Sequence, residues 1–504
     1  MIDLRVANAR AAVRDTPGEL QLRRVDIDIA GDRIVAVTPA GTPAEPAREV
    51  IDAAELLAVP GFVNGHHHSH ENFQKGRFEG LPLELWMNLV RPMKPIPLTG
   101  EQVYLRTMIG AIEALRSGTT TIVDDMNVSP VLDRAHVEAA LQAYEDIGIR
   151  AYLGMTLFDK PFFQSVPFVQ EHFAPETLAE LASVAATPPG EVLAYAGELA
   201  TVRNPRDARV AFIAAPSAPQ RCTDDFLRAV RALADRHELP VIIHVHETRM
   251  QVVTAQEFYG TSMIAHLAKL DFLKPATSII HGVWLTGADL DIIAAAGASI
   301  QHNPNSNLKL GSGLMPLREA LRRGVNVSLG TDGCGSIESV DMLRVLANTA
   351  LIHNLRDDHH DEWITSAEAF AAAPEGGAHA LGRDDLGRIA AGAKADIALY
   401  DTRSIAFTPL NRPLAQLTYS ETGRALKHLL VDGRMVMRDG ALACIDEAAM
   451  LRRIAEAAER LAPAIADAEA AVGRIRPAYE AIHARCCAMP IPDGIWPAKL
   501  AGRS

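Results

Sequence analysis

Eight short apolar segments, each followed by a stretch with helical spacing, dominate the chain from residue 59 onward. The helical spacing is clear in residues 103–115 and 137–147, where apolar side chains recur every three or four positions. Eight such units over roughly 250 residues or more are typical of a (β/α)8 barrel. We therefore predict an α/β fold in which residues 59–386 form a TIM-type barrel.

The segments on either side of the expected barrel have the pattern of antiparallel β-sheet. Residues 25–37 contain two alternating runs joined by a Gly31-Asp32 turn, and Asp432-Gly433 is a second hairpin signal. We predict that residues 1–58 and 387–445 together form a small composite β-sandwich domain built from both termini.

The end of the chain, residues 446–504, is expected to be a helical C-terminal extension. It is rich in alanine, carries a long apolar stripe and is interrupted by Pro463 and Pro477. Such a stripe must be buried on the barrel or on a second subunit. We predict a role in assembly or as a lid, with Trp496 anchored in a neighbouring groove, and a homo-oligomer, most simply a dimer.

Composition limits the partners of the chain. The formal net charge of −13 disfavours nucleic acid and anionic membranes. No apolar run approaches the roughly 20 residues that span a bilayer, and residues 1–10 lack the apolar core of a signal peptide. The five cysteines form no C-x-x-C pair and no disulfide framework. We expect a cytoplasmic protein with a small-molecule substrate.

A histidine cluster follows an apolar run near residue 60. Residues 56–59 lead into Pro60-Gly61, a pattern that predicts a buried strand with a turn at its end. His66 and His68 are two positions apart, so in an extended chain both imidazoles face the same side and can reach one metal ion. A solvated histidine-rich loop is the alternative interpretation of this motif alone.

Further candidate ligands stand at the ends of other expected strands. His244 and His281 end the fifth and sixth strands, and Asp332 follows the eighth. Barrel enzymes keep their active sites at this face of the barrel. Three imidazoles and one carboxylate suit Zn²⁺, with Fe²⁺ as the second choice. Such an ion lowers the pKa of bound water to roughly 7 and so supplies hydroxide at neutral pH.

The chain resembles the amidohydrolase superfamily, and within it the aminohydrolase branch, from about residue 20 to about residue 440. This branch includes adenosylhomocysteine and methylthioadenosine deaminases, guanine deaminase and the triazine hydrolases. The motifs that carry the resemblance are PGFVNGHHH (60–68), LRSGTTT (115–121), HVHET (244–248), HGVWLT (281–286), HNPNSNLKL (302–310) and LGTDG (329–333).

The resemblance implies one metal ion and assigns its neighbours. The implied metal ligands are His66, His68, His244 and Asp332. Glu247 is implied as the proton shuttle and His281 as the group that polarises the substrate. Acid–base chemistry agrees, because Asp332 can take a proton from water while Glu247 protonates a ring nitrogen or the leaving amine. No lysine follows the fourth strand, where members with two bridged metals carry one, so a single metal is expected.

Three further residues are candidates for substrate contacts. His246 lies on the same face of its strand as His244, at a position where the family usually has a small residue. We expect it to form a wall of the pocket, with metal coordination as the alternative. Trp86 matches a tryptophan that lines the purine pocket of nucleoside deaminases, or packs as a lid. Leu85 replaces the carboxylate expected beside it, which disfavours a nucleoside. Gln74 can form hydrogen bonds with an amide or with the edge of a ring in the substrate.

These observations predict a metal-dependent aminohydrolase that deaminates a small nitrogen heterocycle or cyclic amidine. An alternative on the same scaffold is hydrolysis of an amide, a urea or a carbon–halogen bond. A non-catalytic scaffold is the remote alternative, and the complete set of ligands argues against it. The sequence does not name the substrate.

Overall fold

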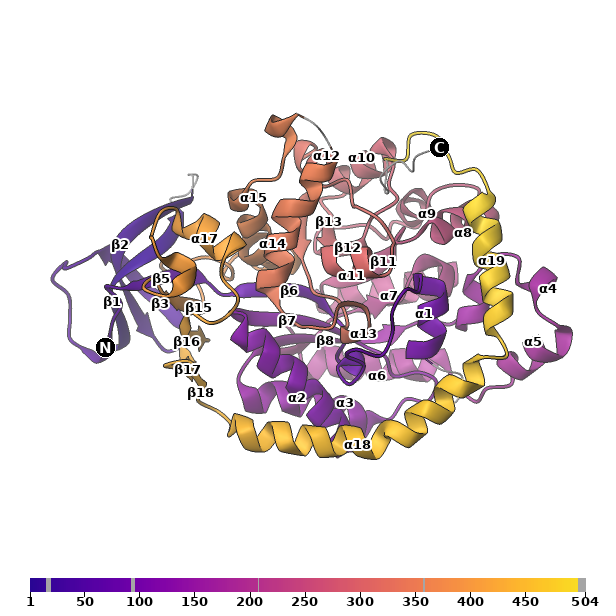
Figure 1. Ribbon diagram of the computed structural model, residues 1–504, viewed down its shortest axis with the longest axis horizontal. Coiled ribbons are helices and arrows are strands. Elements are labelled where there is room, and N and C mark those ends of the chain that lie inside the picture. The colour runs from indigo at the N-terminus through magenta and orange to yellow at the C-terminus, as the bar shows by residue number, and fades with distance from the viewer. Residues whose placement is uncertain (15–19, 92–95, 207, 357–358, 497–504) are drawn as a thin grey trace.

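The computed structural model describes residues 1–14, 20–91, 96–206, 208–356 and 359–496 (Figure 1). Its strands fall into three hydrogen-bonded sheets, two of them entirely parallel. The parallel strands are β6 (Phe62–His67), β7 (Thr119–Met126), β8 (Arg150–Leu157), β9 (Val210–Phe212), β10 (Ala215–Pro216), β11 (Val241–Val245), β12 (Thr277–His281), β13 (Ser299–His302) and β14 (Asn326–Leu329).

The two parallel sheets are neighbours. One has the order β10-β8-β7-β6, with β9 also paired to β8, and the other has the order β11-β12-β13-β14. Ala214 bridges in parallel to Val241 at one junction, and the Asp332 backbone N–H donates to the His66 carbonyl at the other, 2.9 Å away. The expected α/β class and the strand–helix alternation are therefore confirmed, with the fourth strand divided into β9 and β10.

Helices surround the parallel sheets in Figure 1. Several begin with the side-chain caps that their sequences encode; Thr99 and Gln102, for example, form a capping box at the start of α2. The helices are α1 (Leu83–Val90), α2 (Gly100–Arg116), α3 (Arg134–Ile147), α4 (Val169–His172), α5 (Pro175–Ala182), α6 (Pro189–Val202), α7 (Asp224–His237), α8 (Arg249–Tyr259), α9 (Met263–Lys269), α10 (Gly287–Ala295), α11 (Pro304–Lys309), α12 (Leu317–Arg322), α13 (Cys334–Ile337), α14 (Met342–Ile352), α15 (Ser366–Ala371), α16 (Gly377–Ala380), α17 (Pro413–Tyr419), α18 (Glu447–Val472) and α19 (Arg476–Ala488).

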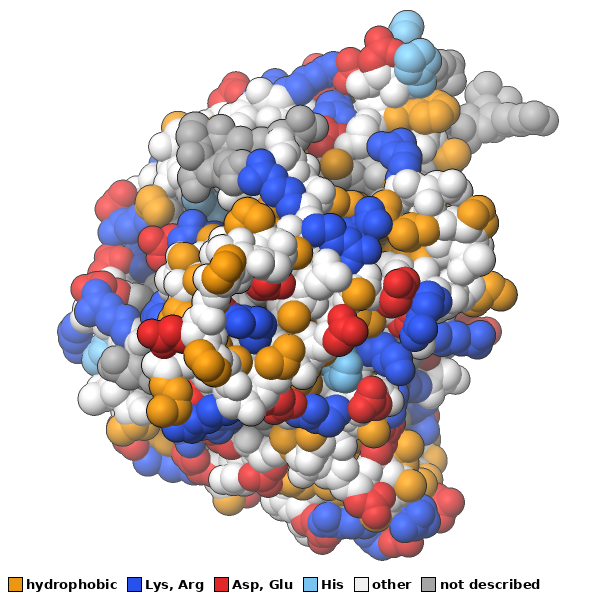
Figure 2. Space-filling view, turned by 90° about the vertical axis from the view of Figure 1, so that its left-hand side faces the viewer, with side chains coloured by type: hydrophobic (Ala, Val, Ile, Leu, Met, Phe, Trp, Pro, Cys, Tyr) orange, Lys and Arg blue, Asp and Glu red, His pale blue; other side chains and the backbone are white. Residues whose placement is uncertain are grey.

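Strands from both ends of the chain form the third sheet. Its order is β18-β17-β16-β15-β5-β1-β2-β3, with β4 paired to β1. The strands are β1 (Ile2–Arg14), β2 (Leu20–Ala30), β3 (Arg33–Pro39), β4 (Ala47–Asp52), β5 (Leu56–Pro60), β15 (Ile397–Asp401), β16 (Leu426–Val431), β17 (Arg434–Arg438) and β18 (Ala441–Leu442). Figure 2 views this end of the molecule, where basic and acidic side chains are interspersed rather than gathered by sign.

The chain crosses from this terminal sheet to the parallel sheet at Gly61. The sequence predicted one strand before the histidines, whereas the structure has β5 in the terminal sheet and β6 in the parallel sheet. The turn is tight, since a Cβ on Gly61 would lie 2.1 Å from the Thr120 side chain. The buried Arg150 guanidinium also joins the two sheets, through ion pairs with Asp396 (3.2 Å) and Asp432.

The C-terminal extension wraps the outside of the helical layer. α18 runs along α2, and α19 packs on α8 and α1 at the side opposite the terminal sheet (Figure 1). Pro463 was expected to interrupt the helix, but α18 continues through it, because its apolar stripe is held by packing. Pro477 instead lies in the first turn of α19, where proline is tolerated. Among the described residues, no helix has both the length and the apolar character needed to cross a membrane.

Candidate metal centre and active site

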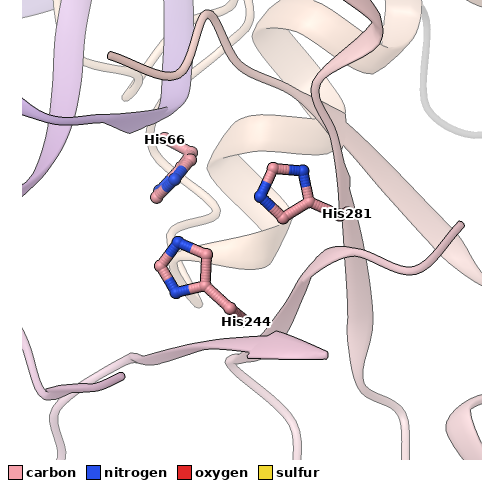
Figure 3. A group of neighbouring side chains, drawn as sticks. All are labelled: His66, His244 and His281. Carbon is pink, nitrogen blue, oxygen red and sulfur yellow. The ribbon is translucent and has the colours of Figure 1, made fainter. Parts of the chain in front are cut away.

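Five polar side chains from four strand ends converge in the structure. His66 lies at the end of β6 and His68 just after it, His244 lies in β11, His281 ends β12, and Asp332 follows β14. Ligand atoms of His66, His244 and His281, and of His66, His68 and Asp332, lie within 4.8 Å of one another. Figure 3 shows the rings of His66, His244 and His281 facing a common space.

The hydrogen bonds of the imidazoles direct their free nitrogens toward this space. Nδ1 of His68 donates to the Asp125 carbonyl (2.7 Å) and Nδ1 of His244 donates to the Ser217 carbonyl (2.8 Å). In the neutral tautomers that these bonds select, each Nε2 keeps a lone pair for a metal. The Nε2 atoms of His66 and His68 each lie 3.5 Å from Asp332 Oδ1.

His66 supplies the clearest test of whether these residues fit a metal ion. Its side chain is completely buried, and neither ring nitrogen has a hydrogen-bond partner. A buried polar atom without a partner is costly, and a divalent cation among three imidazoles and a carboxylate would remove that cost. The donor set therefore fits the expected ion.

Two carboxylates of the site have pKa values displaced in opposite directions. Burial raises the pKa of Glu247 well above its ordinary value, and the neighbouring Asp332 and Glu84 carboxylates add to the effect. Burial alone would raise the pKa of Asp332 too, but the His66 and His68 imidazoles lower it well below its ordinary value. One group is held as a neutral acid and the other as a base, the division that acid–base catalysis requires.

His281 stands between these carboxylates. Its Nε2 lies 3.5 Å from Glu247 Oε2 and 3.9 Å from Asp332 Oδ2. Its Nδ1 donates to Asn307 Oδ1 at 3.0 Å, so Asn307 sets the orientation of the ring. Burial lowers the pKa of His281 to about 4, which keeps the ring neutral at physiological pH.

The expected substrate residues are divided between two spaces. Trp86 is buried and lines the catalytic pocket together with His281 and Glu247, with its Nε1 donating to the Gly335 carbonyl (3.1 Å). Gln74 does not line this pocket; it borders a neighbouring cavity, and its Nε2 approaches the Val90 carbonyl at 3.4 Å.

The structure does not bring His246 to the pocket. Alternation along an extended strand would place it beside His244, but β11 ends at Val245 and His246 has a φ of 51°. The left-handed backbone ends the alternation. His246 Nε2 accepts the Met263 backbone N–H at 2.9 Å, so the ring braces the start of α9.

Two carboxylates that the sequence analysis did not single out also line the pocket. Glu84 stands two positions before Trp86 in α1, is buried, and accepts a hydrogen bond from the Thr248 hydroxyl. The residue directly before the tryptophan is Leu85, so the position expected to carry a carboxylate did not reveal Glu84. Glu71 accepts the Gly335 backbone N–H (3.2 Å), and burial, with Asp332 nearby, raises its pKa well above its ordinary value.

The catalytic pocket and the neighbouring cavity share a wall. The pocket holds about 70 Å³, whereas the cavity holds about 710 Å³ and lies on the side of α1, α2 and α19. Met87, Arg91, Phe162 and Arg221 line both spaces. A ligand larger than a single ring would therefore extend from the pocket into the cavity.

Comparison with known proteins agrees with this geometry. The sequence model described as "Amidohydrolase family" matches residues 57–436. The chain belongs to the amidohydrolase family. Among relatives of this amidohydrolase, a 5-methylthioadenosine/S-adenosylhomocysteine deaminase of Pyrococcus abyssi is 34% identical over 440 residues, which are 87% of this chain and 95% of the relative. A 5'-deoxyadenosine deaminase of Methanothermobacter thermautotrophicus is 31% identical over 439 residues, with coverages of 87% and 94%.

Two solved structures that contain zinc have a fold similar to that of this chain. An adenosine deaminase from Xanthomonas campestris with bound zinc has a TM-score of 0.80 and 26% identity, covering 92% of this chain and 99% of its own. An atrazine chlorohydrolase from Arthrobacter aurescens complexed with zinc has a TM-score of 0.82 and 21% identity, with coverages of 90% and 100%, and supports the fold alone. The prediction of a metal-dependent hydrolase that acts on carbon–nitrogen bonds is confirmed.

Proposed function

We propose that this amidohydrolase deaminates the adenine ring of an adenosine derivative and releases ammonia. The observation that carries the proposal is the geometry of the site: the buried Glu247 carboxyl lies 3.5 Å from His281, beside the cluster of imidazoles and the Asp332 carboxylate that fits a metal ion. The relatives named as deaminases of adenosine derivatives support the choice of ring. Glu84 supports a nucleoside, because its buried Oε2 has no hydrogen-bond partner, with His483 Nδ1 3.7 Å away, and can accept hydrogen bonds from ribose hydroxyls.

The proposal includes finer features of the scaffold. The contacts at both junctions of the parallel sheets support a closed (β/α)8 barrel over residues 59–386, and the terminal sheet supports a composite domain from residues 1–58 and 387–445. The proposed metal ligands are His66, His68, His244 and Asp332. We propose one ion per chain, Zn²⁺ first and Fe²⁺ second, which when bound would act as a Lewis acid toward water.

The residues of the chain then divide the proton transfers. Asp332, whose lowered pKa keeps it ionised, accepts a proton from the attacking water. Glu247, the neutral acid, donates its proton to a ring nitrogen next to the carbon under attack. His281, fixed by Asn307, orients the oxygen that adds to that carbon. Return of a proton to the exocyclic amine allows ammonia to leave and the ring carbonyl to form.

A panel of substrates tests the proposal. The metal-loaded enzyme should release ammonia from adenosine, 5'-deoxyadenosine or 5'-methylthioadenosine, with the change in ultraviolet absorbance that accompanies conversion to the inosine analogue. Guanine and a chlorinated triazine serve as comparison substrates. Turnover of the triazine with none of the adenine nucleosides would refute the proposal and favour carbon–halogen hydrolysis.

A further inference from the structure

Three arginines line the cavity beside the catalytic pocket. Arg91 follows α1, Arg106 lies in α2, and Arg221 ends the short 3-10 helix η3 (Pro219–Arg221). Arg106 and Arg221 are only 8% and 7% exposed. Arg91 and Arg221 face the catalytic pocket as well, so the positive charge begins where the two spaces meet.

None of the three guanidinium groups forms an ion pair with a carboxylate of the described residues. Nε of Arg91 and Nε of Arg106 are buried and have no hydrogen-bond partner. Arg221 Nε donates a long hydrogen bond to the Lys160 carbonyl (3.4 Å), and the guanidinium lies 4.0 Å from the ring centre of Phe158 and 5.9 Å from that of Phe162. Burial lowers the pKa of Arg221 to about 9 and that of Arg106 to about 10.

The carboxylates near these arginines are bound to other groups. They offset part of the positive charge through space, but their hydrogen bonds hold them to the protein. Asp124 accepts from the Ser69 N–H and the Tyr144 hydroxyl, Asp125 from the Thr156 hydroxyl, Asp133 from the Ala135 N–H, and Asp159 from the Thr223 N–H and hydroxyl.

The buried Arg150 and the half-buried Arg318 show how a structural charge is satisfied in this protein. Arg150 is paired with both Asp396 and Asp432, and Arg318 forms a two-pronged ion pair with Glu368. Burying a charge without such a partner is strongly unfavourable. A bound anion would therefore stabilise the arginines of the cavity, and the described residues do not supply one.

His70 adds to the same cavity another donor without a hydrogen-bond partner. Its Nδ1 accepts the Asn127 backbone N–H at 3.1 Å, so the proton of the neutral ring is on Nε2. This buried Nε2 has no hydrogen-bond partner, and the nearest carboxylate oxygen, Glu71 Oε1, is 3.6 Å away. Donors that lack acceptors therefore gather on this wall of the cavity.

We propose that the cavity is an oxyanion subsite in which Arg106 and Arg221 bind a carboxylate or phosphate group carried by the substrate. Guanidinium groups match the geometry of both anions. This inference rests on the proposed function in one respect, namely that the ring under attack occupies the adjoining catalytic pocket. The size of the cavity, about 710 Å³, leaves room for a substituent well beyond the nucleoside.

Matched pairs of substrates test the subsite in the metal-loaded, full-length enzyme. S-adenosylhomocysteine carries a carboxylate that 5'-methylthioadenosine lacks, and adenosine monophosphate carries a phosphate that adenosine lacks. We expect kcat/KM to favour the acidic member of at least one pair, which also identifies the anion. Arg221→Met should lower that preference about 10- to 100-fold, as the loss of a charged hydrogen bond predicts, and Arg221→Lys should lower it less. Arg228→Met, on the exposed surface, is the matched control and should leave the preference unchanged.

Binding without turnover separates this inference from the proposed function. Calorimetric titration of the full-length protein with inorganic phosphate and with malonate should show binding that weakens in Arg106→Met and Arg221→Met. Arginine-dependent binding with no deamination of any adenine nucleoside would support the subsite and refute the proposed function. Deamination with no preference for acidic substrates, and binding unchanged in both variants, would overturn the subsite. Thermal unfolding confirms that each variant is folded.

Discussion

Replacement of Glu247 by glutamine tests the division of roles at the centre of the site. Glu247 Oε2 lies 3.5 Å from His281 Nε2, and its Oε1 has no hydrogen-bond partner, so the side chain faces the reaction space. Glutamine has nearly the same shape but cannot donate an acidic proton. We expect turnover to fall while the metal ligands stay in place.

The magnitude follows from the chemistry of the group. General acid–base residues contribute about 10²- to 10⁴-fold in rate, which corresponds to about 2.7–5.4 kcal/mol of activation free energy. The cost in folding stability should be small, about 1 kcal/mol or less, because burial already holds the Glu247 carboxyl in its neutral form. The variant should therefore be inactive but folded.

Three measurements on one preparation decide the outcome: the rate of ammonia release, the metal content by elemental analysis, and the melting temperature. Glu71→Gln is the matched control, since Glu71 is another buried pocket carboxylate with a raised pKa but lies away from His281 in the hydrogen-bond pattern. A fully active Glu247→Gln, or one that has lost its metal, would refute the role of proton donor. An equal loss in Glu71→Gln would show that replacing any buried acid of the pocket, rather than loss of proton transfer from Glu247, is responsible.

Four further predictions concern the metal, the pH response and the extension. Elemental analysis should find about one divalent metal per chain in the wild type and in His246→Ala, and much less in Asp332→Ala. Unfolding free energy measured with urea should fall as the pH drops below about 6.5, the ordinary pKa of histidine. The reason is that burial lowers the pKa of His353 to about 3, so the unfolded chain takes up this proton first; His353→Gln should lose less stability between about pH 7 and about pH 5. Tyr479→Ala, which removes a buried ring stacked on Phe162, should cost about 3–5 kcal/mol in a denaturation curve. Deletion of residues 446–504 should change the mass in solution if the extension joins subunits, and an unchanged mass with full activity would exclude both a role in assembly and one as a lid.

Local patterns in the sequence determined much of this molecule. The hairpin around Gly31 and the turn at Gly433 follow from residues that are adjacent in the chain, and both are present. The strand ends that carry His66, His244, His281 and Asp332 could be placed in the same way, because each is a short apolar run followed by a polar ligand. The geometry of a parallel sheet then brings such strand ends together without further information.

Other features depended on groups that are distant in sequence, and only the tertiary structure decided them. The His246 ring lies away from the pocket because its Nε2 accepts a hydrogen bond from the backbone N–H of Met263, beyond β11. Glu84 and Arg106 came to face the substrate spaces through the packing of α1 and α2, which periodicity does not describe. Whether a buried charge has a partner is likewise a property of neighbours in space, so the unpaired arginines of the cavity could not be recognised from the sequence. Spacing along a chain encodes local direction, whereas pairing and desolvation are set by the whole fold.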